Sequence, residues 1–436
     1  MRYPLLLTNL MMKPVMLYPD DIGVVYRNEG GHYFRFTWKQ WYERTCQLAH
    51  MLAGPLAMKP GRPGEPGDRI ATMALNHHRH LELCYASTCI GAVAHPINVR
   101  LSRDHIAYTV NHAEDSVVFV DDVFMPLLEL VWDRIKDTVK KVVYMSDKPG
   151  LPRTQVEPIC EYEELLKEQP KTYEWPNLDE NTSAVLYYTT GTTGLPKGVM
   201  FTHRQLYLQA IHLAPHDALW STTAESPEQP GVVVYMASIP LFHIHAWSAP
   251  WRRVYGCNKI VLPGRFSPEV FCELVQAEKV TSTALVPTML AMIVEYPDFQ
   301  KWDMSSLTDV ITGGVALSLG LKAKAERMLP HLVAFSGYGM TETASTIISA
   351  KIRRDMANWP KQKLDEVRTK TGIPIDGIEA RVVDENGNDV PRDNRTQGEI
   401  VLRGHWIMEQ YHKDPERTAT AWLRLMNQPP VPGRSR

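Results

Sequence analysis

The sequence carries almost no net charge and no long uninterrupted hydrophobic run. Its 436 residues include 47 Lys and Arg against 49 Asp and Glu, a formal net charge of −2 at pH 7. Without an excess of positive charge there is no electrostatic reason to expect nucleic acid or an anionic membrane as a partner. The apolar N-terminal residues are interrupted at Pro4, Asn9, Lys13 and Pro14, so they are too short for a membrane span and show no secretory pattern. We therefore expect a cytoplasmic chain without an integral membrane segment.

Cysteine is scarce as well. The six cysteines include no Cys-x-x-Cys pair, which argues against a zinc ribbon or a redox dithiol. A disulfide framework is unusual in a chain of this length, so we expect buried, reduced thiols. Internal repeats and low-complexity tracts are also missing, and a composition of 44% hydrophobic and 22% charged residues is that of a globular protein. The length allows two or three domains or one large composite domain.

What the sequence does contain is an alternation of short apolar runs with helical patterns. Most of the apolar runs have a helical segment between them, as in a parallel sheet with crossover helices. After Gly372, an Asn386-Gly387 turn between two strand-like stretches predicts a small antiparallel β unit. We expect an α/β fold with two α/β subdomains and a small β-barrel-like module, packed as one body. The expected strands are 22–26, 33–37, 69–73, 92–97, 116–120, 142–145, 184–188, 232–239, 259–262, 282–286, 309–311, 332–335, 380–383 and 399–403.

The most specific feature is the glycine-rich segment Tyr187-Tyr-Thr-Thr-Gly-Thr-Thr-Gly-Leu-Pro-Lys-Gly198. Phosphate binding requires close approach of backbone N–H groups, which glycine permits, together with hydroxyl donors and a cation. The segment supplies all three, with Lys197 as the cation. A capping box at Thr202 and Gln205 predicts a helix behind it, so we expect the loop at a helix N-terminus. The alternative is a flexible surface loop, and the density of phosphate-binding groups argues against it.

This loop differs from the nucleotide-binding loop of ordinary NTPases. Counting from Gly191, that motif requires Gly before the Lys and Ser or Thr after it, whereas Pro196 and Gly198 stand at these positions. The segment instead resembles the phosphate loop of the adenylate-forming superfamily, which comprises acyl-CoA synthetases, luciferases and adenylation domains. The residues that the resemblance assigns to ATP are Thr189, Thr190, Gly191, Thr192, Thr193, Gly194 and Lys197, and it also assigns Thr189 to the metal.

Gly337-Tyr-Gly-Met-Thr-Glu342 resembles the second signature of the same superfamily. The resemblance implies that Tyr338 stacks on adenine, that Thr341 contacts the α-phosphate and that Glu342 binds Mg²⁺. These roles suit an aromatic face, a hydroxyl and a hard carboxylate. Taken alone, Thr341 and Glu342 would indicate only a helix start, and Gly313-Gly314 only a strand-to-helix turn. The nucleotide-binding residues implied in this half are Gly313, Gly314, Val315, Ser336, Gly337, Tyr338, Gly339, Met340 and Thr341.

Two histidines, His243 and His245, lie two residues apart. On a strand both would face one side, so a metal pair is conceivable, but without an evident third ligand ordinary hydrogen-bonded histidines are favoured. Their segment resembles the Pro-x-Phe-His stretch that lines the acyl pocket of fatty acyl-CoA synthetases. By this resemblance Trp247 gates the acyl tunnel and His243 approaches the carboxylate. A further run, His77-His-Arg-His80, is interpreted as a solvated helix start.

The resemblance extends over about residues 68–423. Segments 79–83, 98–102 and 111–115 are similar to medium- and long-chain fatty acyl-CoA synthetases in particular. The resemblance implies an acid–thiol ligase in which ATP and Mg²⁺ activate a carboxylic acid as the acyl-adenylate, and coenzyme A then displaces AMP. It leaves a homodimer open. The catalytic residues implied are Lys197, Thr341, Glu342 and His243, and the acyl-contacting residues are His243, Trp247 and Gly314.

The C-terminal residues depart from the family pattern. After the strand Gly398–Gly404 the family continues into an Arg/Lys-Thr-Gly-Asp motif, a hinge and a mobile C-terminal domain that carries the adenylation lysine. Here a proline-containing tail stands in that place. We expect residues 1–424 to form the large AMP-binding domain, residues 425–436 to be an aberrant tail, and the C-terminal domain to be absent. On this basis we expect weak ATP binding and slow unaided adenylation.

Two other functions stay open. One is another carboxylate-activating enzyme on the same fold, such as an aryl-CoA ligase or a luciferase-like enzyme. The other is a non-catalytic protein that binds nucleotide or acyl chains. Substrate-dependent release of pyrophosphate separates the enzymes from each other, and nucleotide binding without turnover would support the non-catalytic alternative.

Overall fold

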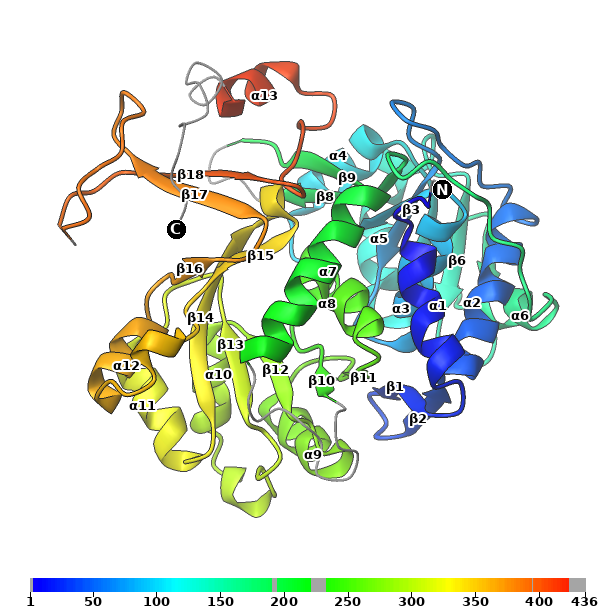
Figure 1. The fold of residues 1–436 in the computed structure, drawn as a ribbon. Helices are drawn as coiled ribbons and strands as arrows, with labels where there is room; N and C mark the ends of the chain where they lie inside the picture. Colours follow the sequence, from blue (N-terminus) through cyan, green and yellow to red (C-terminus); the bar gives the residue numbers. More distant parts are fainter. Residues whose placement is uncertain (1–2, 190–193, 221–232, 394, 423–436) are drawn as a thin grey trace.

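The computed structural model describes residues 3–189, 194–220, 233–393 and 395–422, which form two large sheets, a two-stranded sheet and the helices that cover them (Figure 1). The expected aberrant tail lies outside the described residues. The first sheet contains, in spatial order, β7 (Ile159–Glu161), β6 (Lys141–Met145), β5 (Asp115–Asp121), β3 (Arg69–Met73), β4 (Val93–Pro96), β8 (Ser183–Thr189) and β9 (Lys197–Thr202). The second contains β16 (Ile373–Pro374), β15 (Ser345–Ser349), β14 (Val333–Met340), β13 (Asp309–Thr312), β12 (Ser282–Leu285), β10 (Val234–Met236), β11 (Lys259–Leu262), β1 (Ile22–Arg27) and β2 (Tyr33–Thr37).

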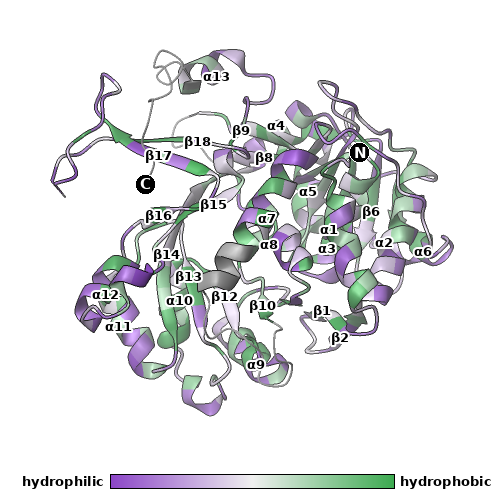
Figure 2. Ribbon diagram, viewed as in Figure 1, coloured by the Kyte–Doolittle hydropathy of each residue, from purple (hydrophilic) through white to green (hydrophobic). Residues whose placement is uncertain are grey.

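Helices separate the two sheets and cover their outer faces. Those between the sheets are α1 (Leu7–Leu17), α3 (His78–Cys89), α7 (His203–Trp220) and α8 (Ile244–Tyr255). The first sheet also packs against α2 (Trp38–Ala53) and α6 (Tyr162–Lys167), and on its other face against α4 (Arg103–Ala113) and α5 (Met125–Ile135). The second is covered by α9 (Pro268–Glu278), α10 (Pro287–Val294) and α11 (Leu319–Met328), with α12 (Lys361–Arg368) beside α11. Figure 2 shows hydrophilic residues concentrated on outer elements such as α11 and α12.

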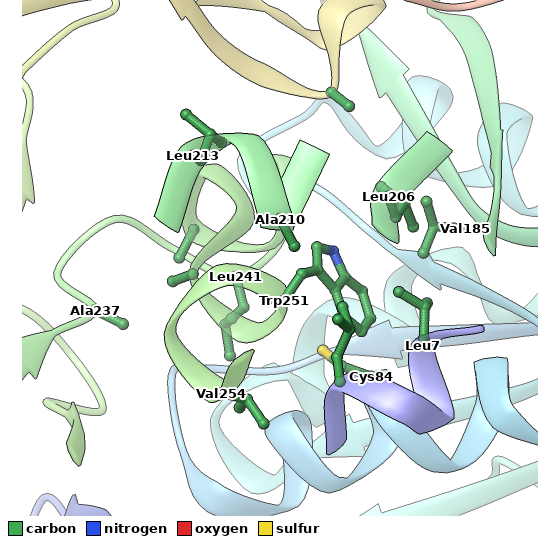
Figure 3. Packing of buried hydrophobic residues seen from close by; sticks show 14 of the residues in the cluster. Leu7, Cys84, Val185, Leu206, Ala210, Leu213, Ala237, Leu241, Trp251 and Val254 are labelled. Carbon is green, nitrogen blue, oxygen red and sulfur yellow. The ribbon is translucent and has the colours of Figure 1, made fainter. Parts of the chain in front are cut away.

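Trp251 lies at the centre of the core that joins the two sheets. Its indole is fully buried and meets the ring of Tyr85 edge-on, with 5.1 Å between the ring centroids. Figure 3 shows side chains around it from α1 (Leu7), α3 (Cys84) and β8 (Val185). A single continuous cluster therefore unites both sheets through the central helices, which explains how two subdomains pack as one body.

The predicted α/β architecture is confirmed, and most predicted strands match within a few residues. The two sheets, however, do not correspond to the N-terminal and C-terminal halves of the chain. β1, near the N-terminus, pairs in parallel with β11 of the second sheet, and β8 pairs with β4 of the first. Exchange of strands between the halves fixes the two sheets relative to each other.

The predicted antiparallel β unit is present as a hairpin of β17 (Ile378–Val383) and β18 (Glu399–Gly404), followed by α13 (Pro415–Trp422). The predicted Asn386-Gly387 turn directly follows β17, where Asp384 N donates to the Asn388 carbonyl oxygen at 2.9 Å and the φ of +83° at Gly387 suits glycine. In the part of the chain that the structure describes, the two strands of this unit form a sheet of their own.

The run His77–His80 begins helix α3, as predicted, but it is buried, so the expectation that it is solvated is wrong. The His77 ring lies 2.7 Å from the Asp121 carboxylate, and His80 lies 3.1 Å from both the Thr72 hydroxyl and the Leu75 carbonyl oxygen. These partners satisfy side chains that would otherwise be costly to bury. They lie up to 44 residues away in the chain, which is why local sequence could not reveal them.

Two buried histidines are expected to make stability depend on pH. Burial lowers the pKa of His80 and of His203 to about 4, against 6.5 for a free histidine. Between these values the unfolded chain binds protons that the folded chain excludes, so stability is complete above about pH 6.5 and falls as the pH drops towards 4. From pH 7.5 to 5.5 each histidine should remove about 1.4 kcal/mol from the free energy of unfolding, measured with urea.

The variant His203→Gln tests this assignment. The His203 ring accepts the backbone N–H of Leu7 at 3.2 Å, and a glutamine amide can accept the same bond without titrating. The variant should lose less stability than the wild type over the same pH interval. An identical pH dependence in both proteins would contradict the assignment.

None of the helices in the described residues is long and apolar enough to cross a membrane. All six cysteines are free thiols, four buried and two (Cys160 and Cys257) half-buried, which confirms the expected absence of disulfides and, for four of them, the expected burial.

Candidate active site

The glycine-rich segment connects two antiparallel strands. β8 and β9 pair along their length, with Thr189 opposite Lys197 at the open end of the hairpin. The expectation of a loop at a helix N-terminus is therefore wrong, because β9 comes between the loop and α7. The capping box itself is present, since Gln205 N donates to the Thr202 hydroxyl at 3.3 Å and Gln205 Oε1 accepts from Thr202 N at 3.0 Å. The predicted phosphate-binding residues Thr190, Gly191, Thr192 and Thr193 lie outside the described residues.

The second signature lies on β14, where the strand changes partners. Residues up to Ser336 pair in parallel with β13, and those from Gly337 pair antiparallel with β15. Gly339 is required by this crossing, because a Cβ atom there would lie 2.0 Å from the Ser345 carbonyl oxygen. β14 thus extends through Met340, beyond the predicted end at residue 335, and delivers the next residues to the end of the sheet.

Tyr411 brings together two charged side chains of the site, Glu342 and Lys197. Glu342 lies in the short 3₁₀ helix η3 (Thr341–Thr343), and Lys197 begins β9. The Tyr411 hydroxyl donates to Glu342 Oε1 at 2.8 Å and accepts from the Lys197 ammonium at 3.0 Å. The sequence analysis did not identify Tyr411.

The acyl-side candidates surround two neighbouring cavities. Trp247 lines both of them, a cavity of about 690 Å³ that also contacts His243 and Gly314, and one of about 60 Å³ that also contacts Gly313 and Gly339. A Cβ atom at Gly313 would lie 3.0 Å from the Trp247 ring, so the glycine permits this close contact. Trp247 therefore contacts both a large cavity and a small one beside the second signature.

Trp247 is held in an unusual backbone conformation. Residues 244–248 all have left-handed φ values, from +45° to +71°, although none is glycine. Such residues are strained by about 1–2 kcal/mol each, so the surroundings must hold them. The Tyr187 hydroxyl bonds His245 Nδ1, and the Ser248 hydroxyl bonds Gln209, whose amide nitrogen in turn donates to the Ala344 carbonyl oxygen. Buried hydrogen bonds thus connect this turn to β8 and to the residue after η3.

The two histidines of this turn do not form a metal pair. They are not on a strand, because the left-handed turn sends His245 into the core and leaves His243 at the large cavity. His245 bonds Tyr187, as favoured for an ordinary core histidine. Burial, together with the nearby Arg100 guanidinium, lowers the pKa of His243 to about 4, so its imidazole is neutral at pH 7. No cluster of three potential metal ligands among His, Cys, Asp and Glu occurs in the described chain.

Two buried hydroxyls suit a bound nucleotide. Thr189 Oγ1 and Ser336 Oγ are buried and have no hydrogen-bond partner among the described residues. Buried hydroxyls normally have a hydrogen-bond partner, so a ligand with phosphate or sugar oxygens would supply one to each of them. A Mg²⁺ ion usually takes one or two protein oxygens and several from phosphate and water, which the carboxylate of Glu342 and the hydroxyl of Thr189 fit.

Residues 13–412 match the AMP-binding enzyme family. The chain belongs to this family. This AMP-binding enzyme is 36% identical over 399 residues to a long-chain-fatty-acid–CoA ligase of Thermus thermophilus, covering 91% of this chain and 69% of that protein. It is 32% identical over 403 residues to a medium-chain-fatty-acid–CoA ligase of Ectopseudomonas oleovorans, covering 91% and 70%. An anthranilate CoA ligase in complex with anthranoyl-AMP has the same fold, with a TM-score of 0.80 over 96% of this chain and 74% of that one at 19% identity.

The predicted site residues of this AMP-binding enzyme fall into two adjacent groups. Thr189, Lys197 and Glu342 gather around the end of the β8–β9 hairpin, whereas His243, Trp247 and the glycines gather at the cavities. β14 and η3 connect the groups. The half-buried Tyr338 stands between Gly337 and Gly339 on β14, and Val315 is 63% exposed. No role in either group follows from the described contacts of Met340.

Proposed function

We propose that this chain is an ATP-dependent, AMP-forming acid–CoA ligase that acts on medium- or long-chain fatty acids. The observation that carries the proposal is the convergence of Lys197 and Glu342 on one hydroxyl, in a chain whose Trp247 lines two cavities. The family assignment and the two fatty-acid ligases among the relatives support the reaction and the acid class.

The first step joins two anions. A carboxylate oxygen attacks the α-phosphorus of ATP, the bond to the leaving pyrophosphate breaks, and acyl-adenylate forms. Lys197 faces the leaving pyrophosphate, and the hydroxyls of Thr189 and Thr341 hydrogen-bond phosphate oxygens. Glu342 and Thr189 would hold Mg²⁺, which would supply positive charge beside the phosphates. Such charge stabilisation is the main source of catalysis in phosphoryl transfer.

The second step transfers the acyl group. The sulfur of coenzyme A attacks the acyl carbon, AMP leaves with the bonding electrons, and the thiol proton is lost. His243 is neutral at the large cavity, so its one ring N–H can donate a hydrogen bond to the carboxylate without adding charge beside it. We assign Tyr338 to the adenine face, and Gly313, Gly314 and Val315 to the wall opposite it. That the protein forms a homodimer and works in the cytoplasm stays a prediction.

The acyl chain is assigned to the region behind Trp247. The 60 Å³ cavity is too small for a long chain, and Trp247 lines it together with the larger one. We infer that removing the indole joins the two. Each additional buried methylene contributes about 0.8 kcal/mol, so a lengthened cavity should favour longer chains by roughly fourfold per methylene.

Binding of stable acyl-adenylate mimics tests the proposal without requiring turnover. Octanoyl-, dodecanoyl- and palmitoyl-sulfamoyl adenosine are compared with the benzoyl mimic by calorimetry, and pyrophosphate release is followed with the corresponding acids. At least one fatty acyl mimic should bind about tenfold or more tightly than the benzoyl mimic. Trp247→Ala should shift the preference towards longer chains. A preference for the benzoyl mimic would establish the aryl-CoA alternative, and no binding of any mimic would overturn the proposal.

A further inference from the structure

Tyr411 is the side-chain partner shared by both charged groups of the site. Among the described residues, the one hydrogen-bond and cation–π partner of the Lys197 ammonium is Tyr411, whose hydroxyl lies at 3.0 Å and whose ring centroid lies at 4.3 Å. The Glu342 carboxylate likewise has the Tyr411 hydroxyl as its one side-chain partner, at 2.8 Å. Both charges are half-buried, and they lie within two hydrogen bonds of each other.

Two opposite charges this close would attract each other strongly at a half-buried site, where water screens them incompletely. A direct ion pair would occupy the carboxylate oxygens of Glu342 and the ammonium protons of Lys197. These are the same atoms that a divalent cation and phosphate oxygens require. The phenol prevents this, because one hydroxyl accepts from the ammonium and donates to the carboxylate, which satisfies both while holding them apart.

The backbone around Tyr411 is anchored to the elements that carry both charges. Tyr411 forms a bridge with Val199 on β9, and His412 N donates to the Gly198 carbonyl oxygen at 2.8 Å. On the other side, Met408 N donates to the carbonyl oxygen of Glu342 at 2.8 Å. The Tyr411 side chain is 6% exposed, so packing also restricts the ring. The hydroxyl is therefore fixed relative to Lys197 and Glu342 together.

We propose that Tyr411 is a positioning residue of the adenylation site, which keeps Lys197 and Glu342 from pairing and so leaves them available for the phosphates and the divalent cation of the nucleotide. This inference rests on the proposed function, since it assumes that a metal–nucleotide complex is the ligand. The ring packs and contacts the ammonium, whereas the hydroxyl performs the separation. The two contributions can thus be tested separately.

Tyr411→Phe removes the hydroxyl and keeps the ring. Without the spacer Lys197 and Glu342 can form a direct pair, so the affinity for the Mg²⁺–ATP complex should fall about tenfold in calorimetry. The loss should shrink as salt is raised, because salt weakens the competing ion pair. Affinity for dodecanoyl-sulfamoyl adenosine, which carries neither pyrophosphate nor metal, should change less than about twofold.

The matched control is Tyr162→Phe. The Tyr162 hydroxyl also donates to a buried carboxylate, that of Glu82 at 2.6 Å, but it lies on α6, away from the site. This variant should bind Mg²⁺–ATP as the wild type does. In a Lys197→Met background, Tyr411→Phe should cause no further loss, because no ion pair can form.

Two results would overturn the inference. One is wild-type Mg²⁺–ATP affinity in Tyr411→Phe. The other is an equal loss with and without Lys197, which would assign the tyrosine a structural role only. Failure of the acyl-adenylate mimic to bind the wild type would instead refute the proposed function, so the two failures are distinguishable.

Discussion

Lys197→Ala is expected to slow acyl-adenylate formation by about 10²- to 10³-fold while changing acyl affinity by less than about twofold. The ammonium faces Tyr411 at the end of the β8–β9 hairpin, whereas the cavity around Trp247 is built by other segments. Two anions react in this step, so losing a cation at the leaving pyrophosphate raises the transition state more than it affects acyl binding. Single-turnover release of pyrophosphate measures the rate, and the dodecanoyl mimic measures acyl affinity.

Lys171→Ala serves as the control, since Lys171 is an exposed lysine whose partner is Glu43 at 3.3 Å. It should release pyrophosphate at the wild-type rate. If Lys197→Ala weakened acyl binding as much as it slowed adenylation, the lysine would be a structural residue. An unchanged rate would remove it from the catalytic site altogether.

The sequence was sufficient for the fold class and the position of the site because the relevant signals are local. Strand β3 and strand β11 match their predicted bounds, since short apolar runs between helical patterns are read within a few residues. The two signatures are also contiguous. In the second signature, Gly339 is required by close approach, because a Cβ atom there would lie 2.0 Å from the Ser345 carbonyl oxygen.

Strand β9 was not predicted, although its sequence contains a strand pattern. Val199 and Phe201 alternate with more exposed residues and are buried, the pattern of a half-buried strand. The capping box at Thr202 predicted only the helix that follows, so the loop was expected directly before that helix. Because β9 pairs with β8, the hairpin and not a helix N-terminus places Lys197 in the site.

Other parts of the site depend on contacts that no local pattern contains. Tyr411 bonds Lys197, 214 residues away, and Glu342, 69 residues away. The left-handed turn around Trp247 consists of residues that disfavour that conformation, so only its hydrogen bonds to distant elements maintain it. Long-range contacts of this kind decide where the functional groups meet.

The segment 79–83, one of those that are similar to fatty acyl-CoA synthetases, takes part in a buried ionic network instead of contacting a candidate ligand site. Arg79 donates to Glu163 at 2.7 Å and to Asp147 at 2.9 Å, and Glu82 accepts from Arg44 at 2.6 Å. Arg44 also donates to Glu163, at 2.9 and 3.0 Å. The network joins α2, α3 and α6 over the first sheet. Arg79 and Glu82 are therefore explained by the ion pairs that they form within the fold.

Arg44→Met is expected to lower the free energy of unfolding by about 3–5 kcal/mol. The Glu82 side chain is completely buried, and besides Arg44 its partner is the Tyr162 hydroxyl at 2.6 Å. Methionine preserves much of the side-chain volume but leaves this carboxylate charged in the interior without a cation. Urea denaturation at pH 7.5 measures the loss.

A second substitution separates the buried charge from the lost packing. In Arg44→Met/Glu82→Gln the uncompensated charge is gone, so part of the stability should return, although the amide still needs hydrogen bonds. Arg62→Ala breaks a pair of similar length, 2.7 Å to Glu65, but the two side chains are 73% and 66% exposed, so the free energy of unfolding should stay close to that of the wild type. Equal losses in Arg44→Met and Arg62→Ala, or no recovery in the double variant, would show that burial of Glu82 does not set the cost. Recovery would establish that the cation is needed because the carboxylate is buried, a requirement of the fold that is independent of ATP and acyl binding.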